Sequence, residues 1–208
     1  MNTRNLAIIG AALLLAGVAF AQPGAEALEL SNDQITIAFD PDDGYAVSSL
    51  VNHAHDVDFI EARPEDDAEQ NRSPWEIEVS SPTHTIMLTA ADAADATHDL
   101  DGDTLTIIWT GIQSEQMPGD LTVTAIVRLP EDSAKAYFRC DVSGETTGWL
   151  WQVDFPRVFG IRDFADCQMS LPYHWGRLVR KPQQLGRSSA IVHPGPAAMQ
   201  WLSYWGVD

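Results

Sequence analysis

The sequence has few basic residues, few cysteines and almost no helical periodicity. Its 208 residues include 12 Lys and Arg against 30 Asp and Glu, which gives a formal net charge of −18. Nucleic acids and anionic lipid surfaces are bound through basic patches, so we expect neither as a partner. Acidity also keeps a protein soluble whatever it binds. Neutral and cationic partners therefore stay open.

Cys140 and Cys167 are the only cysteines. No Cys/His spacing typical of a zinc site occurs, and phosphate loops, dinucleotide fingerprints and a G-x-S-x-G elbow are missing, so we expect no metal and no cofactor. Cys140 alternates with Ala136, Phe138 and Val142, which predicts that its side chain points inward. The two cysteines permit one disulfide in an exported protein, and two separate buried thiols are the alternative.

The one long hydrophobic run lies at the N-terminus. Arg4 precedes an apolar run from Leu6 to Phe20, with Ala19 and Ala21 at the positions that a signal peptidase reads. This pattern predicts a signal peptide over residues 1–21 and a secreted or periplasmic domain over residues 22–208. The run is shorter than the roughly 20 apolar residues that a membrane span needs, so we expect no membrane partner.

Period-two alternation of apolar and polar residues dominates the rest of the chain. Together with closely spaced turn signals it predicts an all-β fold, an antiparallel β-sandwich. Trp75 and Trp109 fall on the inward faces of their segments. Two acidic stretches, 61–74 and 91–99, are expected to be connections. The expected strands are 34–39, 45–52, 75–80, 84–90, 105–112, 121–129, 135–143, 149–156 and 167–172.

Several motifs also stand in a familiar order. The opening NDQITIAFDPDDGYAVSSLVNHAHDVDFI resembles the galactose-mutarotase-like β-supersandwich that precedes the catalytic barrel in bacterial glycoside hydrolases. The later segments WLWQVDFPRVFGI, LPYHWGRLVRKP and HPGPAAMQWLSYW follow in the order found in secreted glycoside-hydrolase-like proteins. The resemblance covers most of residues 30–205.

This resemblance implies that the sandwich is incomplete at its C-terminus. In such relatives the aromatic segment corresponding to 197–205 is an interior strand, and a (β/α)₈ barrel with the catalytic carboxylates follows it. The resemblance therefore implies a fragment whose partner barrel is missing from the chain, and we assign no catalytic residue. An edge strand at 197–205 that exposes apolar side chains is expected to promote aggregation.

Three functions remain open. The resemblance favours a non-catalytic N-terminal β-sandwich domain of a secreted glycoside-hydrolase-like protein acting on carbohydrate. The alternatives are a free-standing carbohydrate-binding module and a mutarotase-like sugar epimerase.

Aromatic residues are the candidates for contact with carbohydrate, because sugars stack their C–H faces on aromatic rings. Trp149 and Trp151 flank Leu150 and are expected to share one face, where core packing competes with glycan binding. Asp154 lies in the same apolar strand, and pairing with Arg157 is its expected role. A loop forms the second candidate group, a polar-aromatic rim of Tyr173, His174, Trp175 and Arg177.

Overall fold

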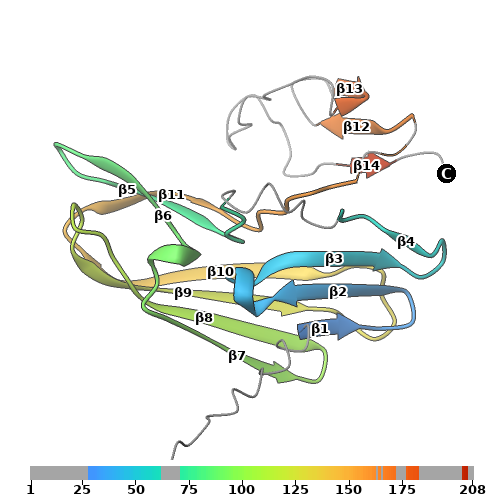
Figure 1. Ribbon diagram of the computed structural model, residues 1–208, viewed down its shortest axis with the longest axis horizontal. Coiled ribbons are helices and arrows are strands. Elements are labelled where there is room, and N and C mark those ends of the chain that lie inside the picture. The colour runs from blue at the N-terminus through green and yellow to red at the C-terminus, as the bar shows by residue number, and fades with distance from the viewer. Residues whose placement is uncertain are drawn as a thin grey trace, which may run out of the picture.

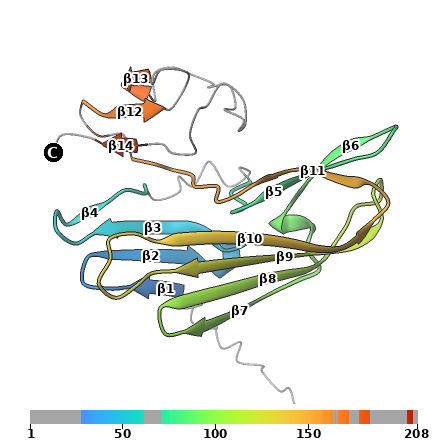
Figure 2. The ribbon, with the colours of Figure 1, turned by 180° about the vertical axis from the view of Figure 1, so that it is seen from behind.

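Antiparallel strands make up most of the computed structural model, which describes residues 28–61, 71–162, 164, 166–171, 177–182 and 203–205. The first four-stranded sheet has the order β1-β2-β3-β4 and the second the order β10-β9-β8-β7 (Figures 1 and 2). The strands of the first sheet are β1 (Leu28–Ser31), β2 (Ile35–Asp40), β3 (Ala46–Asn52) and β4 (Val57–Asp58). Those of the second are β7 (Asp95–Asp101), β8 (Thr104–Ile112), β9 (Gly119–Arg128) and β10 (Tyr137–Thr146).

Two three-stranded sheets complete the described part of the chain. One has the order β11-β5-β6 and the other the order β13-β12-β14. Their strands are β5 (Glu76–Ser80), β6 (Thr85–Thr89), β11 (Trp149–Asp154), β12 (Gln168–Leu171), β13 (Arg177–Arg180) and β14 (Ser203–Trp205). Two short 3₁₀ helices, η1 (Pro41–Asp43) and η3 (Ala90–Asp92), lie in turns. Among the described residues we find no helix with the length and apolarity that crossing a membrane requires.

One hydrophobic core joins the two four-stranded sheets and the β11-β5-β6 sheet. Alternate residues of β9 are buried, as the sequence pattern predicted, and those of β8 and β5 face the same core. Trp109 on β8 is fully buried in it, with its ring edge-on to Tyr45, just before β3, and to Trp75, just before β5. The predicted antiparallel β-sandwich is thus confirmed.

Two sequence predictions about connections are wrong. The polar stretch 91–99 was expected to be a connection, but β7 begins within it and pairs with β8 without a break from Asp95↔Thr110 to Asp101↔Thr104. The strong strand β8 supplies this ladder, which overrides the low strand propensity of β7. Arg177 was expected in a loop but begins β13.

Several other predictions fall on residues outside the described ones. These are the signal peptide at 1–21, most of the acidic stretch 61–74, and the loop residues Tyr173, His174 and Trp175. Of the aromatic segment 197–205, the structure describes Ser203–Trp205, which pairs with β12.

The chain passes from one sheet to another at a tight corner between β10 and β11. Gly144, near the end of β10, has a φ of +102°, and a Cβ atom there would lie 2.1 Å from the carbonyl oxygen of Asp120 on β9. A Cβ atom on Gly148, just before β11, would lie 2.5 Å from the carbonyl oxygen of Ser80 on β5. Neither position accepts a side chain without movement of the backbone, so both glycines are needed for this corner.

Candidate functional site

One face of the β11-β5-β6 sheet carries both large exposed side chains and polar groups. Cross-strand partners share a sheet face, and so do residues two apart along a strand. The strand register therefore places nine side chains in three rows on this face, which we call the three-row face. The rows are Trp149–Ser80–Thr85, Gln152–Glu78–Met87 and Asp154–Glu76–Thr89.

Trp149, Leu150 and Trp151 form an exposed apolar run on β11. Trp149 is 48% exposed and Trp151 is 68% exposed, so of the two alternatives for these residues, core packing is wrong. The register shifts between Leu150 and Gln152, which makes Trp151 the extra residue of a β-bulge. The expected shared face of the two tryptophans assumed regular alternation, and the bulge interrupts it. Trp149 consequently shares its face with Gln152.

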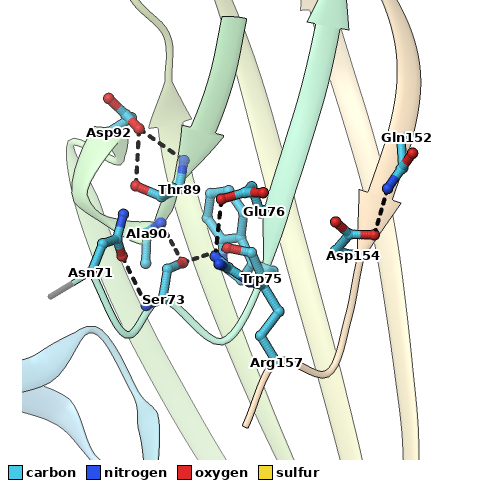
Figure 3. A network of polar contacts seen from close by, with 10 residues as sticks. All are labelled: Asn71, Ser73, Trp75, Glu76, Thr89, Ala90, Asp92, Gln152, Asp154 and Arg157. Atoms are coloured by element: carbon cyan, nitrogen blue, oxygen red, sulfur yellow. Dashed lines mark hydrogen bonds and ion pairs between the residues drawn. The ribbon is translucent and has the colours of Figure 1, made fainter. Parts of the chain in front are cut away.

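The third row contains the expected Asp154, with a partner different from the expected one. Asp154 accepts a hydrogen bond of 2.8 Å from the side-chain amide of Gln152 on the same strand (Figure 3). Arg157 instead forms an ion pair of 3.1 Å with Glu76, and both side chains are about three-quarters buried. Arg157 is also held by its own backbone N–H, which donates to the Pro74 carbonyl. This anchor directs its side chain to β5 rather than back to β11.

The turn that leads into β5 is fixed by hydrogen bonds. The buried hydroxyl of Ser73 donates to the Trp75 carbonyl at 2.5 Å and accepts from the Ala90 backbone N–H at 2.8 Å (Figure 3). Asp92 accepts from both the backbone N–H and the hydroxyl of Thr89, which fixes the end of β6. The third row of the three-row face therefore has a rigid frame.

The carboxylate of Asp58 accepts hydrogen bonds that hold neighbouring parts of the fold together. It accepts from the Ser49 hydroxyl at 2.7 Å and from the backbone N–H groups of Leu50 and Ile60 at 2.9 Å. Burial raises the pKa of Asp58, but these hydrogen bonds and the charge of Arg162 outweigh burial and hold the pKa below its usual value. A carboxylate in this state connects β3 to β4 and is a poor general acid.

The two cysteines are thiols in the structure, which corresponds to the second of the two alternatives. Cys140 is partly buried against the core, so its predicted inward orientation is confirmed. Burial and then the charge of Asp141 raise the pKa of Cys140 to about 11. Cys167 is buried just before β12. Within the described residues no group of three or more His, Cys, Asp or Glu side chains is placed to hold a metal ion.

The structure describes the whole three-row face but only one residue of the predicted loop site. Arg177 lies on β13, while its expected neighbours Tyr173, His174 and Trp175 lie outside the described residues. Sequence reasoning missed Glu78, Met87 and Gln152 as neighbours of Trp149. The alternation of 75–80 placed Glu76 and Glu78 outward, but their alignment with β11 depends on a register that spans about 75 residues of sequence.

Comparison of the chain with family models, with curated proteins and with solved structures finds no match.

Proposed function

We propose that the chain is a non-catalytic β-sandwich domain of a secreted, carbohydrate-active protein, and that its three-row face binds glycan. The observation that carries the proposal is the exposure of Trp149 and Trp151 beside polar side chains of the same sheet. Exposed apolar patches on soluble proteins mark binding sites more often than chance. The resemblance of the sequence to domains that accompany glycoside-hydrolase barrels supports carbohydrate as the ligand and secretion as the location.

The chemistry of the face suits a sugar chain. A tryptophan ring offers a flat apolar surface to the C–H bonds on one side of a sugar. Gln152 and Glu78, in the next row, offer an amide and a carboxylate that bind hydroxyl groups. Rows in a sheet lie about 6.8 Å apart and strands about 4.8 Å apart, so stacking and hydrogen bonding fall on neighbouring parts of one ligand.

Binding to a panel of neutral and charged glycans tests this proposal. Trp149→Ala should weaken binding by about tenfold, because one stacked ring contributes about 1.4 kcal/mol, whereas Trp151→Ala, on the bulge outside the three rows, should weaken it less. Tyr137→Ala is the matched control, since Tyr137 is an aromatic residue that is 57% exposed and lies on β10, in a different sheet.

Each outcome is decisive for the proposal. Glycan binding that weakens in Trp149→Ala and is unchanged in Tyr137→Ala supports it. A folded chain that binds no glycan of the panel refutes it, and so does binding that Trp149→Ala leaves unchanged.

A further inference from the structure

The three-row face carries negative charge that nothing on it balances. Its nine residues include three acids, Glu76, Glu78 and Asp154, and no basic residue. Arg157 approaches from the following segment, but its charge is committed to Glu76 at 3.1 Å, and its guanidinium lies 5.0 Å from the centre of the Phe159 ring. Glu78 forms no ion pair with any described residue, and Asp154 receives only the neutral amide of Gln152. Two uncompensated carboxylates therefore lie within one or two rows of Trp149.

We infer that the three-row face selects glycans that carry free amines, such as polymers of glucosamine. The inference rests on the proposed function, in which the ligand is a sugar, and it adds that this sugar carries a positive charge. An ammonium group on a ring stacked against Trp149 would lie nearest the carboxylate of Glu78, and one further along the sugar chain would lie nearest that of Asp154. A sugar amine is cationic in mildly acidic solution, and opposite charges at that range attract.

The same charges disfavour acidic glycans. A uronate or sulfated sugar on this face would place its anion beside Glu78, and like charges at that range repel. The net charge of −18 on the whole chain adds a longer-range repulsion of polyanions. Neutral sugars retain the stacking contact but gain nothing from the carboxylates. The expected order of affinity is amine-bearing, then neutral, then acidic glycans.

A basic peptide is the competing occupant, and the edge of the sheet argues against it. Peptides commonly bind a sheet by adding a strand to its edge, where main-chain hydrogen bonds give the affinity. The edge strand that carries the tryptophans is β11, and its bulge at Trp151 interrupts the regular spacing that an added strand would need. Beside the tryptophans, the side chains of the face, rather than the backbone of the β11 edge, are therefore the binding elements.

Calorimetric titration of the whole chain with glycans of matched length tests the inference. The probes are oligomers of glucosamine, N-acetylglucosamine and galacturonate, with oligolysine as the peptide probe. We expect glucosamine oligomers to bind about fivefold tighter than their acetylated forms, a difference that shrinks as salt is added. Glu78→Gln should remove this preference while leaving the acetylated oligomer bound as before. Asp99→Asn, an exposed acid on β7, is the control that removes the same charge elsewhere.

The outcomes separate this inference from the proposed function. Equal affinity for glucosamine and its acetylated form overturns the charge selection and leaves glycan binding in place. A preference that Asp99→Asn reduces as much as Glu78→Gln, or oligolysine binding that equals glucosamine binding and depends on Glu78, also overturns it. Failure of every glycan to bind refutes both proposals together, with circular dichroism showing that each variant is folded.

Discussion

Replacing Trp109 and Trp151 separately by alanine should have very different effects on stability. Trp109 is 1% exposed in the core, where its ring contacts Tyr45 at 5.8 Å and Trp75 at 5.7 Å between centroids. A buried tryptophan removes about 150–250 Å² from water, which at about 25 cal/mol per Å² corresponds to about 4–6 kcal/mol. We expect Trp109→Ala to lose about 3–5 kcal/mol of unfolding free energy, a large share of the about 5–15 kcal/mol of a typical domain.

Trp151 is 68% exposed, so the same arithmetic gives at most about 2 kcal/mol for Trp151→Ala. Urea denaturation followed by far-ultraviolet circular dichroism measures both losses without relying on the fluorescence of the residues removed. Trp109→Phe provides a third point. It keeps an aromatic ring and removes an indole N–H that has no hydrogen-bond partner among the described residues, so its loss should be well below that of Trp109→Ala. Equal losses for the two alanine variants would refute the assigned burial of these two residues.

Three further predictions concern ionisable groups. With its pKa raised to about 11 from 9.0, Cys140 should react with an alkylating reagent near pH 8 about 100-fold more slowly than an ordinary thiol, and a rate that levels off near pH 9 would contradict this. Because the pKa of Asp58 is lowered by folding, its stabilising contribution is present above the usual aspartate value of about 3.9 and is lost as the pH falls through the folded value. Melting temperatures of Asp58→Asn should therefore fall less steeply in acid than those of the unaltered chain. A double-mutant cycle on Glu76→Gln and Arg157→Met should give a coupling of about 1 kcal/mol, and additive losses would mean that the partly buried ion pair adds no stability.

The sequence predicts the strands with strong alternation well, for a simple reason. Buried residues at every second position, such as Val123 and Ala125 on β9, leave a pattern that needs no knowledge of the partner strand. The strand β7 lacks this signal. Opposite the buried residues of β8 it has Ala96, His98 and Leu100, of which the last two are exposed, and its pairing with β8 decides its structure. Propensity is a property of the segment alone, whereas this ladder is a property of two segments.

The candidate site is predictable only in part. Tryptophans as sugar-stacking residues could be proposed from residue type, and Glu78 could be placed outward by alternation. The exposure of Trp149 and Trp151 could not be derived, because it depends on a bulge and on β11 lying at an edge of its sheet. The ion pair of Arg157 with Glu76 was also beyond sequence reasoning. It joins residues 81 positions apart, while the nearest acid in the sequence, Asp154, pairs with Gln152.

The glycine corner between β10 and β11 limits how this protein can change over generations. The atoms nearest to a side chain added at Gly144 or Gly148 are main-chain carbonyl oxygens of β9 and β5. A substitution elsewhere in the chain cannot remove these atoms. Main-chain atoms therefore help to set the angle at which β11 leaves the β10-β9-β8-β7 sheet, and the side chains of Met117 and Val79 also crowd Gly148. New ligands can be accommodated by exchanging residues on the three-row face one at a time, because the scaffold that orients this face keeps its shape. Substitutions that change specificity are therefore expected at positions such as 78, 87 and 152, and not at 144 and 148.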